Sequence, residues 1–256
     1  MNEQLLREAI KMFNIQSVMQ LIRYLLLGVL VFWFFWIHGK EKFKSKKIQK
    51  AYFLKSQIKV ELMQSMVTVV IFGFIAALSH VAHKAGYLHF YKDFNHYGPW
   101  YPFFSFFVLL VVHDAYFYWT HRLLHVPGLY ERFHLAHHTS YNPTPLVLYS
   151  FHPVEAAING AIIPFVAIFC PLHISVVAFF TFYSAIFNSI AHLGYEIYGR
   201  WFIKLGFSKW VTASLHHNLH HQTFKDNYGF YFRFWDRLMG TEVKDYDQRL
   251  GEMIQP

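Results

Sequence analysis

The sequence predicts an all-α fold: an integral membrane bundle of four to five transmembrane helices with a histidine-rich helical cap on the cytosolic side. Hydrophobic residues make up 55% of the 256 positions, and the mean hydropathy is +0.22. Charged residues make up 15%, whereas a soluble domain carries about 25%. The single cysteine, Cys170, excludes a disulfide framework and a cysteine-based metal site, so a metal in this chain of 18 histidines needs mainly nitrogen ligands.

Five apolar runs support the membrane bundle, because each is close to the ~20 residues that a spanning helix needs. They cover residues 21–37, 62–79, 102–119, 154–172 and 174–191. The first run is apolar apart from Arg23 and has no small-residue cleavage site, which indicates a retained anchor rather than a cleaved signal peptide. The last two runs are predicted to form a hairpin that bends at the far interface, and residues 80–101 an external loop.

Lysines indicate the orientation of the helices. Residues 39–59 contain eight lysines and one glutamate, and the positive-inside rule places such a loop in the cytosol. The second helix then runs outward and the third returns, so residues 120–153 and 193–256 also face the cytosol. The net charge of +8 is therefore interpreted as a topology and lipid-headgroup signal. No nucleic-acid motif accompanies it, so we expect no nucleic-acid partner.

Histidines cluster in both of these cytosolic segments. The stretch HRLLH places His121 and His125 four residues apart, on one face of a helix. A helix over residues 102–126 would be roughly 37 Å long and would extend beyond a hydrocarbon core of about 30 Å. The stretches HLAHH and HNLHH repeat one spacing and supply His134, His137, His138, His217, His220 and His221.

This pattern of histidines predicts two metal ions. A lone histidine on an apolar helix is most often a hydrogen-bonded core residue, but packing does not require eight of them at helical spacing. Neutral imidazoles that converge on a cation explain the pattern better, and their number exceeds the ligands of one ion. Residue type alone leaves zinc, copper, iron and nickel open. The first stretch lacks the glutamate of H-E-x-x-H, which argues against a zinc protease.

The order of these motifs resembles the fatty acid hydroxylase/sterol desaturase superfamily of membrane di-iron oxidases. The stretch DAYFYWTHRLLH (114–125) is similar to the first histidine box of that family, and HHTSYNPTPLVLYSFHPVEA (137–156) to the segment after its second box. NYGFYFRFWDRLMGT (227–241) resembles the family's C-terminal motif. The short first box and the NPTP segment look more like the sterol oxidase branch than the fatty acid 2-hydroxylase branch.

The resemblance implies two iron ions as cofactors, O2 as oxidant and nine histidine ligands. The implied ligands are His121, His125, His134, His137, His138, His192, His217, His220 and His221. Asn188 lies one helical turn before His192. It either contacts the metal through a water molecule or has only a packing role in the helix bundle. The di-iron domain is expected over residues 101–245, after the anchor helices and external loop (1–100) and before a tail (246–256).

Four further residues are candidates for a hydrogen bond to the ring nitrogen of a ligand imidazole that does not bind the metal. They are Asp114, His152, Glu155 and Asp236. Asp114 lies in a membrane span, where a carboxylate is costly and usually functional. We favour a role for it in fixing the tautomer of a ligand imidazole over a structural pair, for instance with a tyrosine. His216 is left out because it points off the ligand face, and His113 is expected in the core.

The predicted function is hydroxylation or desaturation of a C–H bond in a sterol-like or fatty acyl lipid. Electrons would come from a separate protein, because no haem-binding or flavin domain is recognisable. A basic cluster could dock that protein: Lys204, Lys209, Lys225, Arg233 and Arg237. A zinc-dependent lipid hydrolase is an alternative, and a metal transporter is less favoured because most spans lack a polar path. Without a recognisable retrieval signal, a bacterial inner membrane is preferred over the endoplasmic reticulum.

Overall fold

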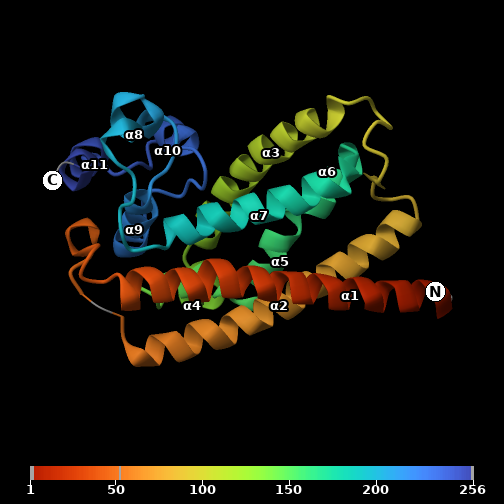
Figure 1. Ribbon diagram of the computed structural model, residues 1–256, viewed down its shortest axis with the longest axis horizontal. Coiled ribbons are helices and arrows are strands. Elements are labelled where there is room, and N and C mark those ends of the chain that lie inside the picture. The colour runs from red at the N-terminus through yellow and green to blue at the C-terminus, as the bar shows by residue number, and fades with distance from the viewer. Residues whose placement is uncertain (1–2, 52, 255–256) are drawn as a thin grey trace.

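The computed structural model describes residues 3–51 and 53–254, which fold mostly into helices (Figure 1). In chain order, the helices and strands are α1 (Glu3–Tyr24), α2 (Lys55–Lys84), β1 (Phe90–Tyr91), α3 (Tyr101–Leu124), α4 (Leu135–His138), α5 (Pro153–Gly160), α6 (Ile162–Phe169), β2 (Leu172–His173), α7 (Ile174–Ala191), α8 (Arg200–Lys204), α9 (Ser214–Thr223), α10 (Phe234–Met239) and α11 (Tyr246–Ile254). The all-α membrane bundle predicted from the sequence is confirmed.

Among the described residues, four helices are long and apolar enough to cross a membrane. They are Glu3–His38, which continues α1 through two π-helical segments, and α2, α3 and α7. The α1 and α2 helices run antiparallel and pack closely (Figure 1). Gly73 of α2 permits this approach, because a Cβ atom there would lie 2.1 Å from Ser17 Oγ of α1.

The run over residues 154–172, predicted as a fifth span, is divided into two short helices. The apolar helical segment Pro153–Phe169 is about 26 Å long, less than the hydrocarbon core of about 30 Å. Pro164 lacks the N–H that would bond to Gly160 in a continuous helix, and α5 ends at that glycine. The prediction of a spanning helix here is therefore wrong, whereas the one over 174–191 matches α7.

A short parallel strand pair closes the end of the bundle opposite the histidines (Figure 1). Phe90 pairs with Leu172 and Tyr91 with His173, which joins the loop after α2 to the turn between α6 and α7. The turn between these two helices thus lies at the end predicted for the hairpin bend.

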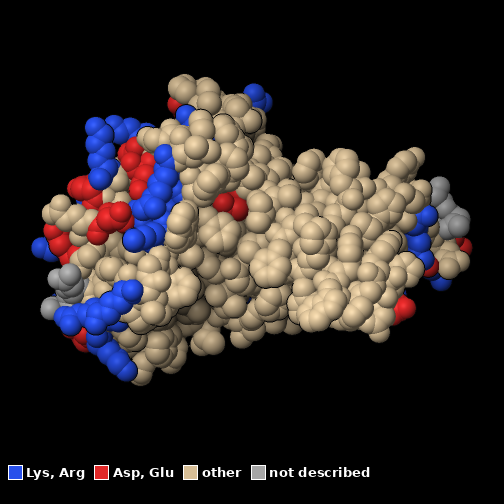
Figure 2. Space-filling view, turned by 90° about the horizontal axis from the view of Figure 1, so that it is seen from above, with Lys and Arg blue, Asp and Glu red and all other residues tan. Residues whose placement is uncertain are grey.

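The distribution of side chains on the surface agrees with a bundle surrounded by lipid. Figure 2 shows charged side chains gathered mainly at the two ends of the molecule, with an almost uncharged face between them. Large apolar side chains on this middle part are exposed, for example Leu78, Phe107 and Val111. A continuous exposed apolar surface marks a region that contacts other apolar matter, here the hydrocarbon core.

The chain after α7 forms a cap at one end of the bundle, where α8 to α11 gather around α9 (Figure 1). Its small core contains Phe202, Leu215, Leu219, Tyr246 and Leu250. The α9 helix is polar in sequence, yet every residue from Ser214 to His221 is buried. A buried helix with four imidazoles needs partners for them, and those partners define the candidate site.

Candidate metal centre

All nine histidines implied as ligands converge at the junction of the bundle and the cap, in two groups. The first group holds five imidazoles: His121, His125, His134, His138 and His220. The second holds four: His137, His192, His217 and His221. Within each group the candidate ligand atoms lie within 4.8 Å of one another, so each group could hold one metal ion.

The repeated H-x2-HH spacing divides its histidines between both groups. In the first repeat His134 and His138, four residues apart, join the group of five, and His137 joins the group of four. In the second repeat the division is reversed: His217 and His221 join the group of four, and His220 the group of five. Each pair of adjacent histidines therefore contributes to both groups, and this places the two groups side by side.

The distances between nitrogens in each group are close to those that a shared cation would require. His138 Nε2 lies 3.2 Å from His125 Nε2 and 3.1 Å from the Nε2 atoms of both His134 and His220. A neutral imidazole has one N–H and one lone pair, so three such contacts cannot all be hydrogen bonds. Nitrogens bound about 2.0–2.1 Å from a shared zinc ion are separated by roughly 3.3 Å, which is close to these distances.

The second group shows the same arrangement. His217 Nε2 lies 2.9 Å from His192 Nε2 and 3.2 Å from His221 Nε2. His192 Nε2 lies 3.3 Å from His137 Nε2. The donor set of both groups is entirely nitrogen, which suits zinc, copper, iron and nickel ions better than magnesium or calcium.

Outer hydrogen bonds leave the Nε2 lone pairs of several ligands pointing inward. The Nδ1 atoms lie close to backbone carbonyl oxygens, at 3.1 Å for His121 and Tyr228, 3.2 Å for His137 and Ser150, 2.9 Å for His192 and Asn188, and 2.7 Å for His220 and Asp226. Because only Nδ1–H can donate to a carbonyl, these contacts fix the tautomer in which Nε2 is free to bind a metal.

The imidazoles are kept neutral by their surroundings. Burial and the neighbouring imidazoles lower the pKa of His134, His138 and His217 well below its usual value, and burial lowers the pKa of His192 to about 4. Burial and the neighbouring imidazoles also lower the pKa of His137, His220 and His221 well below its usual value. Neutral imidazole is the form that binds metals.

These lowered pKa values predict acid-sensitive stability in the metal-free protein. Above about pH 6.5 the folded and unfolded chains are both neutral at these histidines. Below it the unfolded chain binds more protons, and each affected histidine lowers the free energy of unfolding by up to about 1.4 kcal/mol per pH unit. Burial raises the pKa of Glu196 to about 7 and that of Glu155 well above its usual value, and these two carboxyl groups oppose the trend of the more numerous histidines.

Thermal unfolding in detergent with a chelator, followed between about pH 5 and pH 8, measures the effect. We expect the midpoint to fall as the pH decreases below about 6.5. A midpoint that is constant or rises on acidification would contradict the buried neutral state.

Glu155 was proposed to hold a ligand imidazole, and its position fits that role. Its Oε1 atom lies 2.9 Å from His134 Nδ1, and both side chains are buried. Pro153 at the start of α5 and the N-cap His152 direct this helix so that its first turn faces the metal centre.

We expect Glu155→Ala to weaken metal binding about 10- to 100-fold, because it removes the outer partner of a ligand. Glu155→Gln should have a smaller effect, since its amide oxygen still accepts a hydrogen bond. Competition with a chelator measures the affinity. The control is Glu131→Ala, at an exposed glutamate that bonds the backbone N–H of Gly128. Equal affinity in Glu155→Ala and wild type would show that Glu155 does not support His134.

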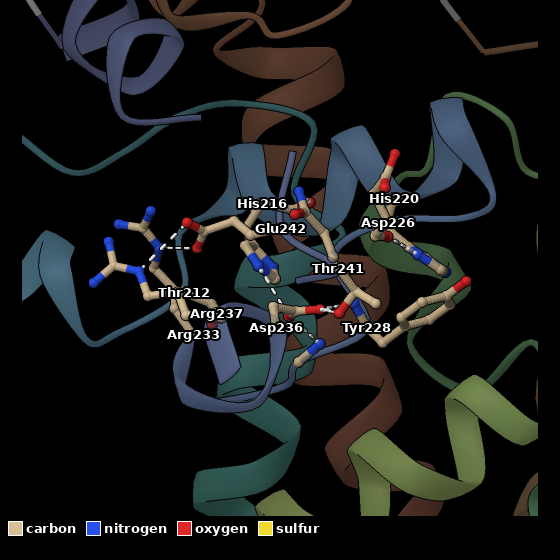
Figure 3. A network of polar contacts seen from close by, with 12 residues as sticks. Thr212, His216, His220, Asp226, Tyr228, Arg233, Asp236, Arg237, Thr241 and Glu242 are labelled. Carbon is tan, nitrogen blue, oxygen red and sulfur yellow. Dashed lines mark hydrogen bonds and ion pairs between the residues drawn. The ribbon is translucent and has the colours of Figure 1, made fainter. Parts of the chain in front are cut away.

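Asp236 supports the site one step further out (Figure 3). It accepts hydrogen bonds from the backbone N–H groups of Tyr228 (2.8 Å) and Gly229 (2.7 Å) and from Thr241 Oγ1 (2.8 Å). His216 Nε2 lies 3.3 Å from Asp236 Oδ2, the oxygen that also accepts from Gly229, and His216 belongs to neither histidine group. Asp236 thereby fixes the Tyr228 carbonyl that faces His121, rather than contacting a ligand directly.

Two of the proposed outer partners do not contact a ligand in the structure. Asp114 Oδ1 instead accepts hydrogen bonds from the backbone N–H groups of Tyr231 (2.9 Å) and Phe232 (3.1 Å). Asp114 lies two helical turns before His121, so its carboxylate is too far away to reach that imidazole. At this height of the helix, the carboxylate faces the segment that follows Gly229. His152 is the N-cap of α5, and its Nδ1 accepts a hydrogen bond from Val154 N at 3.2 Å. Pro153 between them is the first residue of the helix. These corrections leave Asp114 and His152 with structural roles.

The basic cluster proposed for docking is only partly exposed, and Figure 3 shows its two arginines beside Glu242. Arg233 is fully buried and forms ion pairs with Glu242 at 2.6 Å and Asp247 at 2.7 Å. Arg237 pairs with the same two carboxylates. Both arginines hold α10 and α11 together, so the docking prediction is wrong for the buried Arg233 and stays a prediction for the exposed Arg237. Lys204, Lys209 and Lys225 are exposed.

A cavity of about 510 Å³, mostly apolar, lies within the bundle, and none of the nine candidate ligands lines it. A smaller space touches ligands of both groups, including His121, His137 and His217. The side chains that border both spaces are Phe117, Phe151, Asn159 and Asn188. Asn188 donates to Leu148 O at 2.8 Å, so it packs at this junction and faces the cavity. No motif in the sequence singled out Asn159.

A comparison of the sequence with known protein families identifies the region that contains the two histidine groups. A sequence model described as fatty acid hydroxylase matches residues 106–241, which include all nine histidines. The chain belongs to the fatty acid hydroxylase family. This family assignment confirms the superfamily predicted from the motifs. No solved structure matches the chain significantly.

The relatives support the sterol oxidase-like branch of the family. A Delta(7)-sterol 5(6)-desaturase of Gibberella zeae is 30% identical over 74% of this chain and 57% of its own length. A probable Delta(7)-sterol 5(6)-desaturase of Neurospora crassa is 30% identical over 97% of the chain and 67% of its own length. The lathosterol oxidase of Homo sapiens is 26% identical over 93% of the chain and 77% of its own length. The chain thus spans little more than half the length of the first of these relatives.

Proposed function

We propose that this protein is a membrane di-iron oxidase that hydroxylates or desaturates a C–H bond of a sterol-like or fatty acyl lipid. The observation that carries the proposal is the pair of histidine groups, five and four imidazoles, beside an apolar cavity of about 510 Å³. The fatty acid hydroxylase family and the desaturase and oxidase names of the relatives favour iron and O2 over the zinc hydrolase alternative.

The residues of this chain would bind, orient and protect the reactants. Two iron ions, when bound, would supply the reduction of O2 and the removal of hydrogen from an unactivated C–H bond. The two histidine groups would hold these ions, and Glu155 would keep a proton on His134 Nδ1. Phe117 and Phe151 would guide the lipid and exclude water where the cavity meets the centre. An error of about 1 Å in this placement can redirect or stop such a reaction.

Electrons would come from a separate protein that approaches the cap. The exposed Lys204, Lys209 and Lys225 remain candidates for contacting an acidic donor. The relatives named above are eukaryotic, which favours the endoplasmic reticulum over the bacterial inner membrane preferred from the sequence. The cytosol is the side we propose for the cap, because the lysine-rich segment 39–59 lies at the same end.

Turnover with isotopically labelled O2 tests this function. Iron-loaded protein is incubated with a cell lipid extract, a reductant and ¹⁸O2, and the lipids are analysed by mass spectrometry. Hydroxylation adds one labelled oxygen, and desaturation removes two hydrogens without adding label. Cleaved lipids that form without O2 would instead indicate the zinc hydrolase.

A further inference from the structure

A buried arginine lies in the wall of the cavity, away from the nine candidate ligand histidines. Arg23 of α1 is 7% exposed and lines the cavity. Its Nη1 donates to Gln20 Oε1 at 2.5 Å and its Nη2 donates to Thr181 Oγ1 of α7 at 3.0 Å. Gln20 Oε1 also accepts a hydrogen bond from the Tyr149 hydroxyl at 2.8 Å. Side chains from three parts of the chain therefore fix the guanidinium in one place.

The charge of this guanidinium has no counter-ion among the described residues. Its partners, Gln20 and Thr181, are neutral, and no carboxylate of residues 3–51 or 53–254 lies within ion-pair distance of it. Arginine stays protonated in proteins, and an unpaired charge inside a membrane span is costly and usually functional. Gln20 and Thr181 take up two of its five N–H donors and the neutral Tyr149 hydroxyl is a third hydrogen-bond partner, so the remaining donors are free for a ligand in the cavity.

We propose that Arg23, with Gln20 and Thr181, binds the carboxylate of a long-chain lipid acid whose chain lies in the cavity. A carboxylate would neutralise the guanidinium and accept two parallel hydrogen bonds from it. A neutral hydroxyl, such as that of a sterol, would accept a hydrogen bond but leave the charge unpaired. Elsewhere the cavity wall is largely apolar, with Phe72, Phe180 and Val177 available to pack against a hydrocarbon chain.

The position of this site would determine which carbon reaches the metal centre; this step alone rests on the proposed function. Thr181 and His192 lie on the same helix, eleven residues apart, which is roughly 16 Å along its axis. The cavity and the much smaller space beside the candidate ligands share Phe117 and Phe151 as a wall, so the far end of a chain bound in the cavity would lie next to the metal centre. An acid bound at Arg23 would present carbons far from its carboxylate for oxidation.

Equilibrium binding of oleic acid and its methyl ester in a neutral detergent tests the site. The wild type should bind the acid at least about tenfold more tightly than the ester, as expected for a charge-assisted pair. Arg23→Gln should abolish this preference, and Arg23→Lys should retain part of it. The matched control is Arg7→Gln, on the same helix, where the side chain is exposed and pairs with Glu3.

Equal affinity of the wild type for acid and ester would overturn the proposal, and so would an acid preference that persists in Arg23→Gln. The wild-type comparison stands even when Arg23→Gln does not fold. Binding is measured without O2 or reductant, and the iron content of each sample is measured separately. Protein that prefers the acid but binds no iron would keep this inference and refute the proposed function. Protein with iron that oxidises sterols without an acid preference would do the reverse.

Discussion

A His138→Ala variant is expected to lose one of two bound metal ions and all measurable lipid oxidation. The Nε2 atom of His138 faces three other imidazole nitrogens, at 3.1 to 3.2 Å, so it is central to its group. Loss of an outer partner costs about 10- to 100-fold in metal affinity, and loss of a direct ligand should cost more. His221→Ala, in the other group, should also lose one metal ion.

The control for both variants is His152→Ala. His152 is a histidine of the same region that caps α5 and belongs to neither group. Loss of an N-cap costs about 1 kcal/mol of stability, but both metal ions should remain bound. Metal content by mass spectrometry of the elements, with turnover in parallel, measures the result. Two metal ions in His138→Ala would contradict its assignment as a ligand.

An Asp236→Ala variant is expected to lose several kcal/mol of stability and to bind the metal of the five-histidine group weakly. The carboxylate is fully buried and accepts hydrogen bonds from the N–H groups of Tyr228 and Gly229. Each N–H left buried and unpaired costs about 1–3 kcal/mol. The freed segment would also release the Tyr228 carbonyl that faces Nδ1 of His121.

The thermal unfolding midpoint and the metal affinity should therefore fall together in Asp236→Ala. Asp245→Ala is the matched control, because Asp245 is exposed and its surface pair with Arg249 contributes little to stability. An unfolding midpoint like that of the control would show that Asp236 does not fix the segment around Tyr228.

The sequence was sufficient to predict which histidines come together but not how they are divided between two groups. Helical spacing placed His134, His138, His217 and His221 in pairs four residues apart, and the motifs added the rest. The division into groups of five and four depends on how α3, α4, α7 and α9 meet in space. No local pattern contains that information, because each H-x2-HH stretch serves both groups.

Errors in the prediction arose where partners are distant in the chain. Asp114 bonds the backbone of Tyr231 and Phe232, more than a hundred residues away, so its helical stripe with His121 was misleading. Arg233 was treated as a surface charge, but its partner Asp247 lies on α11 and closes over it. Arg23 was visible in the sequence only as a charge in an apolar run, and its cavity requires α1, α2 and α7 together. The division at residues 100 and 245 stays a prediction.

Metal content and spectroscopy of detergent-purified protein test the central claim most directly. The protein is produced in iron-replete cells, and the wild type is compared with a His137→Ala/His220→Ala double variant, which removes one ligand from each group. We predict about two iron ions per chain, as two ligand groups require, with a spectrum that changes when reduced protein meets O2, and loss of both properties in the variant. Zinc in place of iron, with no response to O2, or well-folded wild-type protein without any metal, would contradict the account.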